Sequence, residues 1–95
     1  MKIYLSGPIT RCKDYHKKFE AAAEMLKNKG HSVINPANLY LCMPPDTTHE
    51  EYIKLSLNML EMADAIYMLP GWEGSKGACI EYEYAKEWGL ITVVL

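Results

Sequence analysis

The chain has 95 residues, of which 49% are hydrophobic, and carries a formal net charge of −2 and three cysteines. These values predict a single domain over residues 1–95, with enough apolar side chains for one core. The negative charge argues against nucleic acid as the main partner, because phosphate backbones select clustered Lys and Arg. Zinc-type cysteine spacing and long apolar runs are absent from the sequence. We therefore expect a cytoplasmic protein with reduced thiols, no metal, no cofactor and no membrane partner.

Short apolar runs alternate with longer amphipathic segments along the chain. The runs are continuous rather than alternating, as is typical of parallel strands buried on both faces, and they lie at 2–5, 32–34, 65–69 and 90–95. Helices are expected between them, over about 14–29, 48–63 and 75–88. This alternation implies right-handed crossovers and a doubly wound α/β sheet.

Local signals support these helix boundaries. The first helix ends at Gly30, a common C-terminal glycine, and gathers its apolar residues on one face: Phe19, Ala22, Ala23 and Leu26. Thr48 and Glu51 fit a capping box at the start of the second helix. Residues 36–47 form the one long irregular connection, and we interpret it as a functional lid.

Ligands of doubly wound sheets lie beyond the carboxyl ends of the strands. Three loops are expected at that edge, over residues 6–10, 35–36 and 70–77. The last loop is broken by glycines and enters the third helix, whose free N–H groups and positive dipole end suit phosphate or another anion. Trp72 lies in this loop and is a candidate for stacking on a base.

Glu81 occupies an unusual position on the third helix. At 100° per residue it falls within a stripe that otherwise consists of apolar or small residues: Gly77, Ala78, Tyr84, Ala85 and Trp88. Burying a carboxylate costs several kcal/mol unless partners compensate, so Glu81 is a candidate nucleophile or general base. The structural alternative is a carboxylate that holds the loop together by accepting hydrogen bonds from loop N–H groups. Trp88, on the same stripe, is expected in the core.

Three other polar residues also have either a structural or a functional interpretation. Ser56 lies in the apolar stripe of the second helix, where it either serves the site or bonds the carbonyl one turn back. Asp64 is expected to shape the turn into the third strand. Tyr4 follows the pattern of a buried strand, so its hydroxyl needs a partner.

Three segments of the chain occur in a characteristic order: IYLSGPI at residues 3–9, MADAI at 62–66 and GSKGACIE at 74–81. Together they resemble the nucleoside 2-deoxyribosyltransferase-like superfamily, which includes the deoxynucleoside 5'-monophosphate N-glycosidases. The likeness is strongest to a short, phage-associated branch with the signature LPGWxxSxGAxxE, and it spans nearly the whole chain.

The resemblance implies a flavodoxin-like (Rossmann-like) three-layer sandwich with a small, mostly parallel four-stranded sheet. It also implies that Glu81 attacks the anomeric carbon, and that Ser75 and Gly77 hold a 5'-phosphate. Residues implied to line the sugar and base pocket are Tyr4, Ser6, Gly7 and Ile9. Ser56 stands where relatives carry a catalytic aspartate, and a hydroxyl does not replace a carboxylic acid at neutral pH.

Two functions follow as competing hypotheses. One is an enzyme that hydrolyses or exchanges the N-glycosidic bond of a (deoxy)nucleoside or its monophosphate through a glycosyl-Glu81 intermediate. The other is a catalytically degenerate nucleotide-binding module. A weaker resemblance, to lysine-decarboxylase-like phosphoribohydrolases, rests on Pro70-Gly71 and residues 77–81, with the spacing wrong by several positions. A homodimer or higher homo-oligomer is expected, because the superfamily completes its site across subunits.

Overall fold

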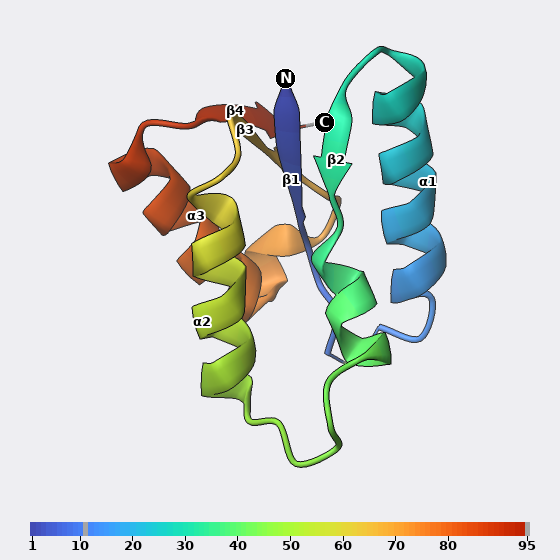
Figure 1. The fold of residues 1–95 in the computed structure, drawn as a ribbon, viewed down its shortest axis with the longest axis vertical. Coiled ribbons are helices and arrows are strands. Elements are labelled where there is room, and N and C mark those ends of the chain that lie inside the picture. Colours follow the sequence, from blue (N-terminus) through green and yellow to red (C-terminus); the bar gives the residue numbers. More distant parts are fainter. Residues whose placement is uncertain (11, 95) are drawn as a thin grey trace.

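Four parallel strands form the central sheet of the protein, in the order β2-β1-β3-β4 (Figure 1). The computed structural model describes residues 1–10 and 12–94. The strands are β1 (Lys2–Ser6), β2 (Ser32–Ile34), β3 (Ala65–Met68) and β4 (Ile91–Val94). The helices are α1 (Tyr15–Asn28), α2 (His49–Leu60) and α3 (Lys76–Trp88), with short 3-10 helices η1 (Pro36–Leu41) and η2 (Trp72–Gly74).

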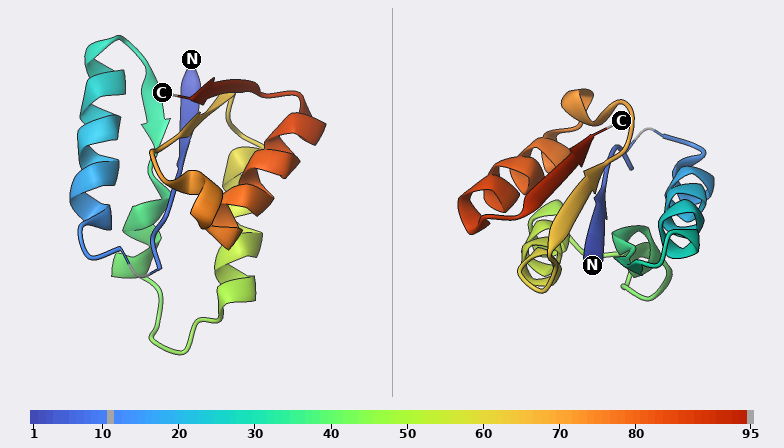
Figure 2. Two further views of the ribbon diagram at one scale, coloured as in Figure 1. Left: turned by 180° about the vertical axis from the view of Figure 1, so that it is seen from behind. Right: turned by 90° about the horizontal axis from the view of Figure 1, so that it is seen from above.

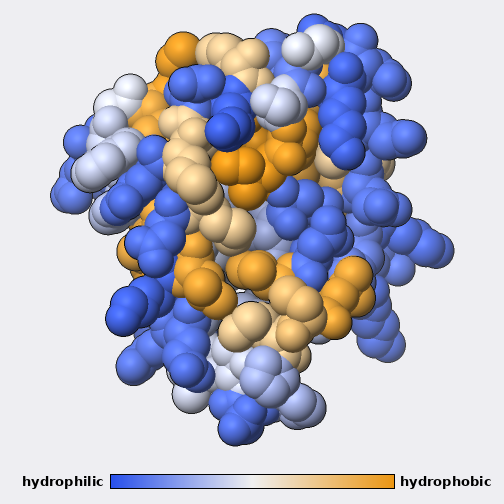
Figure 3. All heavy atoms as spheres, in the orientation of Figure 1, coloured by the Kyte–Doolittle hydropathy of each residue, from blue (hydrophilic) through white to orange (hydrophobic). Residues whose placement is uncertain are grey.

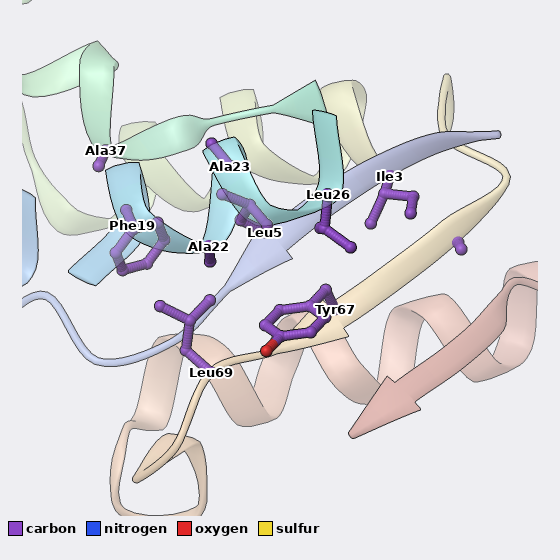
Figure 4. Close-up of a cluster of buried hydrophobic side chains, with 10 residues drawn as sticks. Ile3, Leu5, Phe19, Ala22, Ala23, Leu26, Ala37, Tyr67 and Leu69 are labelled. Atoms are coloured by element: carbon purple, nitrogen blue, oxygen red, sulfur yellow. The ribbon is translucent and has the colours of Figure 1, made fainter. Parts of the chain in front are cut away.

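The helices cover both faces of the sheet, with α1 on one face and α2 and α3 on the other (Figure 2). Successive strand residues point to opposite faces, so each central strand supplies both layers. Ile3 and Leu5 of β1 join the cluster beneath α1, which Figure 4 shows together with Phe19 and Leu26. Tyr4 joins the cluster beneath α2 and α3. The result is a three-layer α/β sandwich.

The predicted fold class is confirmed. Every expected strand and helix is present, with boundaries that coincide or differ by at most three residues where the structure describes them. The sheet, expected to be mostly parallel, is entirely parallel over the described residues. The expected fourth strand reached residue 95, which lies outside the described residues.

The local signals at the ends of the helices are also confirmed. The Thr48 hydroxyl accepts a hydrogen bond from the Glu51 N–H at 3.1 Å, and the Glu51 carboxylate accepts from the Thr48 N–H at 2.8 Å. Gly30 has a φ of 91°, which glycine adopts without strain. Asp64 has the structural role expected of it, since its carboxylate accepts a hydrogen bond from the Lys2 N–H at 2.9 Å.

Two expectations need correction. The connection over 36–47 is not irregular throughout, because its first half is the 3-10 helix η1, which Asn35 caps by accepting a hydrogen bond from the Ala37 N–H. Trp88 is 54% exposed rather than part of the core, and stacks on Tyr84 with ring centroids 6.0 Å apart. It is the last residue of α3, the helix that leads into the edge strand β4.

Over the described part of the chain, no helix combines the length and apolar character needed to cross a membrane.

Candidate functional site

Glu81 is the centre of the candidate site. Its side chain is buried, with 7% exposed, and both carboxylate oxygens accept hydrogen bonds from β1. The Tyr4 hydroxyl donates to Oε2 at 2.5 Å, and the Ser6 hydroxyl donates to Oε1 at 2.7 Å. Because Tyr4 and Ser6 are two positions apart on one strand, they share a face and reach the same carboxylate.

Opposing effects set the protonation of this group. Burial raises the pKa of Glu81 above its ordinary value, while hydrogen bonds from Ser6 and Tyr4, together with the nearby Ser56 hydroxyl, lower it in part. The pKa of Tyr4 is raised well above its ordinary value, first by burial and then by the negative charge of Glu81. The Tyr4 phenol therefore keeps its proton and acts as a donor to the carboxylate.

A cavity of about 410 Å³ opens above this carboxylate. It lies at the carboxyl end of β1 and at the start of α3, which follows β3. Chain connections leave β1 and β3 in opposite directions, so this is the topological switch point, where ligands bind in such sheets. The lining residues from the two strand ends and from the helices around them include Gly7, Ile9, Thr10, Tyr40, His49, Tyr52, Ser56, Ser75, Lys76, Gly77 and Glu81.

The surface around this region is mixed in character. Figure 3 shows apolar side chains gathered in the middle of one face of the molecule, while hydrophilic side chains cover the side formed by α1. In the cavity itself, apolar walls surround a few polar groups, a composition typical of small-molecule sites.

The start of α3 forms one wall of the cavity. The Ser75 hydroxyl caps the helix by accepting a hydrogen bond from the Ala78 N–H at 3.3 Å. A Cβ on Gly77 would lie 3.5 Å from Ile53 Cδ1 and 3.7 Å from His49 Cε1, at ordinary van der Waals distance from α2. First-turn N–H groups of a helix lack intrahelical acceptors, which suits an anionic group.

Most of the residues predicted for the site are brought together. Gly7, Ile9, Ser56, Ser75 and Gly77 line the cavity with Glu81, while Tyr4 and Ser6 lie behind the carboxylate as its hydrogen-bond donors.

Trp72 is the exception among the predicted residues. Its ring packs on Tyr82, with centroids 4.8 Å apart, and joins the cluster beneath α2 and α3 rather than the cavity lining. The reason is that η2 turns its side chain back toward α3.

Sequence reasoning missed the aromatic lining residues that come from η1 and α2: Tyr40, His49 and Tyr52. The Asn35-Pro36 start of η1 was a usable signal, because Asn is a favoured N-cap and Pro a favoured first helical residue. The Thr48 cap likewise fixed the start of α2, and with it the positions of His49 and Tyr52.

Solved structures with the same architecture include two 2-deoxyribosyltransferases and an N-glycosidase. The enzyme of Bacillus psychrosaccharolyticus is 22% identical with a TM-score of 0.80, and the alignment covers 99% of this chain and 71% of that one. The CMP N-glycosidase of Clostridium botulinum is 24% identical with a TM-score of 0.67, covering 99% and 67%. The 2-deoxyribosyltransferase of Leishmania mexicana is 18% identical with a TM-score of 0.73, covering 99% and 63%. At these identities the likeness establishes the fold.

A comparison with curated proteins gave no match. A family model matches residues 1–94, and the chain therefore belongs to the family described as a domain of unknown function, DUF4406.

Proposed function

We propose that this protein cleaves or exchanges the N-glycosidic bond of a (deoxy)nucleoside or its 5'-monophosphate, with Glu81 as the nucleophile. One observation carries the proposal: a buried carboxylate, oriented by two hydroxyl donors, lies at the floor of a cavity at the switch point of the sheet. Buried carboxylates are costly, and clefts that contain one with a perturbed pKa are frequent active sites.

The chemistry would proceed in two displacements. The Glu81 carboxylate attacks the anomeric carbon and forms a glycosyl ester, while the carbon–nitrogen bond breaks and its electron pair leaves with the base, which takes a proton from water. Water, or a ring N–H nitrogen of a second base, then attacks the same carbon, gives its proton to the hydroxide left by the first step, and releases Glu81 as a carboxylate. Two displacements give net retention of configuration.

The solved structures support this choice of reaction. The named activities of the three, 2-deoxyribosyltransferase and CMP N-glycosidase, both involve bonds between a sugar and a base. Membership of the nucleoside 2-deoxyribosyltransferase-like superfamily would explain why the likeness covers 99% of this chain in each case. The assignments to its short phage-associated branch and to the cytoplasm remain predictions.

Base release tests the proposal directly. The purified protein is incubated with common nucleosides, deoxynucleosides and their 5'-monophosphates, and free base is measured by chromatography. We expect release from at least one substrate, loss of release in Glu81→Gln and Glu81→Ala, and a glycosylated wild-type protein by mass spectrometry. Glu83→Gln is the matched control, because Glu83 lies on the same helix with its side chain 68% exposed. No release across the panel would contradict the enzyme proposal.

A nucleotide-binding module without turnover is the second candidate. The observation that favours it is Ser56, which is buried at 7% exposure and lines the cavity where the superfamily has an aspartate. This candidate predicts that a nucleotide raises the melting temperature of wild type and Glu81→Gln alike, without base release. Absence of stabilisation by any nucleotide would count against both candidates.

Homo-oligomerisation also remains a prediction. Large apolar side chains are exposed, with Leu41 at 73%, Trp88 at 54% and Ile91 at 56%. Light scattering on the purified protein measures its mass, and a mass equal to that of one chain would contradict the prediction.

A further inference from the structure

Two tyrosines from different elements form a stacked pair in the wall of the cavity. Tyr40 lies on η1 and Tyr52 on α2, and their ring centroids are 4.2 Å apart with planes inclined by 19°. Both residues line the cavity. Tyr15 at the start of α1 packs edge-on against Tyr40 at 6.0 Å, outside the cavity lining. Three elements thus hold the pair in place.

Together with the imidazole of His49, this pair supplies the accessible aromatic surface of the described cavity. Phe19 also lines it, but Phe19 is only 1% exposed and belongs to the core beneath α1. Tyr40 is 37% exposed and Tyr52 is half-buried. Because Trp72 packs on Tyr82, it does not compete for this role.

The position of the pair fits a leaving group. Tyr52 precedes Ser56 by one turn on the same face of α2, so it lies about 6 Å nearer the start of the helix. Ser56 and Glu81 mark the floor of the cavity, and Tyr52 stands one turn above it. Displacement at an anomeric carbon places the nucleophile and the leaving base on opposite sides of the sugar. A sugar bound above Glu81 therefore directs its base toward Tyr40 and Tyr52.

We propose that Tyr40 and Tyr52 bind the base of the ligand by stacking, while the floor of the cavity holds the sugar. This inference rests on the proposed function for the nature of the ligand, and it assigns the base subsite to η1 and α2. Every base has a π-face, so stacking provides affinity without selecting one base strongly. The structural alternative is a pair that only fastens η1 to α2.

Binding measurements separate the two roles. In a Glu81→Gln background, which keeps the ligand intact, dissociation constants are measured by calorimetry for deoxynucleoside 5'-monophosphates and for 2-deoxyribose 5-phosphate, which has no base. Tyr40→Leu and Tyr52→Leu should each weaken nucleotide binding about 5- to 150-fold, the range expected for one base–aromatic contact. Binding of the sugar phosphate should change less than about twofold. Tyr40→Phe and Tyr52→Phe should retain nucleotide affinity, because they retain the ring.

Tyr84→Leu is the matched control, since Tyr84 stacks on Trp88 and does not line the cavity, and it should leave nucleotide affinity unchanged. Melting temperatures identify variants that fail to fold. If a variant of one tyrosine fails to fold, the comparison of the Phe and Leu variants of the other tyrosine tests the inference. Equal weakening for both ligands, or unchanged nucleotide affinity in the Leu variants, would overturn the inference. If the Leu variants weaken nucleotide binding but not sugar-phosphate binding, and wild type releases no base, the stacking inference is supported and the proposed catalysis is refuted. If no nucleotide binds, both proposals fail.

Discussion

The Tyr4 hydroxyl donates a 2.5 Å hydrogen bond to Glu81 Oε2 across 77 positions of the chain. It joins the first strand to the last helix inside the buried layer between them. The bond has two consequences. It orients the carboxylate toward the cavity, and it partly offsets the rise in the pKa of Glu81 caused by burial.

Replacing Tyr4 by Phe should therefore destabilise the fold. Hydrogen bonds to charged groups contribute about 1.5–3 kcal/mol. We therefore expect the free energy of unfolding at neutral pH, measured by urea titration, to be lower in Tyr4→Phe than in wild type by about this amount. Tyr67→Phe is the control, because Tyr67 lies on the neighbouring strand and faces the cluster beneath α1. Similar losses in the two variants would show that the bond to Glu81 contributes nothing specific.

Glu81 should also give stability a characteristic pH dependence. Its folded-state pKa is raised above the ordinary value of 4.5, so the folded state binds its proton more tightly than the unfolded state does. The resulting stabilisation is fully present below pH 4.5 and is lost as pH rises through the folded-state pKa. The free energy of unfolding of wild type minus that of Glu81→Gln should thus decrease over this window and then level off.

This difference is measured by chemical denaturation at a series of pH values from 4 to 8. Subtracting the Glu81→Gln curve removes the contributions of the other titrating groups, which the variants share. A difference that rises with pH would mean that the hydroxyl donors outweigh burial and that the folded-state pKa is lowered.

Ser56→Asp tests whether the missing carboxylate limits turnover. An acid at this position would lie near Glu81 in the cavity, and acid–base groups typically contribute about 10²–10⁴-fold to a rate. We expect base release to increase about tenfold or more, measured as kcat on the best substrate of the panel. Ser56→Asn is the control for size, and an equal increase there would exclude an acid–base role. A second carboxylate should also raise the pKa of Glu81 and lower stability at neutral pH.

The fold was accessible from the sequence because its signals are local. Continuous apolar runs, the Thr48 cap and Gly30 each depend on a few neighbouring residues, and helical periodicity alone placed Glu81 on a buried face. The partners of Glu81 were harder to identify. Tyr4 and Ser6 were predicted near the ligand by resemblance, but their hydrogen bonds to Glu81 depend on the register between β1 and α3, which no local pattern encodes.

The wrong predictions for Trp72 and Trp88, and the omission of Tyr40 and Tyr52, have the same cause. The surroundings of Trp72 depend on how η2 packs against α3, and those of Trp88 depend on where α3 ends. Tyr40 and Tyr52 are separated along the chain, and their rings stack because η1 and α2 both reach the cavity. Sequence periodicity therefore could not predict these aromatic contacts, since they depend on how the elements pack.

The turn after β1 provides the last prediction, because Gly7 is needed there for space. A Cβ at Gly7 would lie 2.8 Å from Leu69 Cβ, closer than such atoms approach in folded proteins, while the Gly7 φ is not in the left-handed region. Gly7→Ala must therefore separate the ends of β1 and β3, and overpacking of this kind costs about 1–3 kcal/mol. Since Gly7 adjoins Ser6 and lines the cavity, ligand affinity should fall together with the free energy of unfolding.

At Gly74 an added Cβ meets open space, so Gly74→Ala should change stability by less than about 0.5 kcal/mol. Equal stability of the two variants in urea would mean that the strand ends separate at no cost.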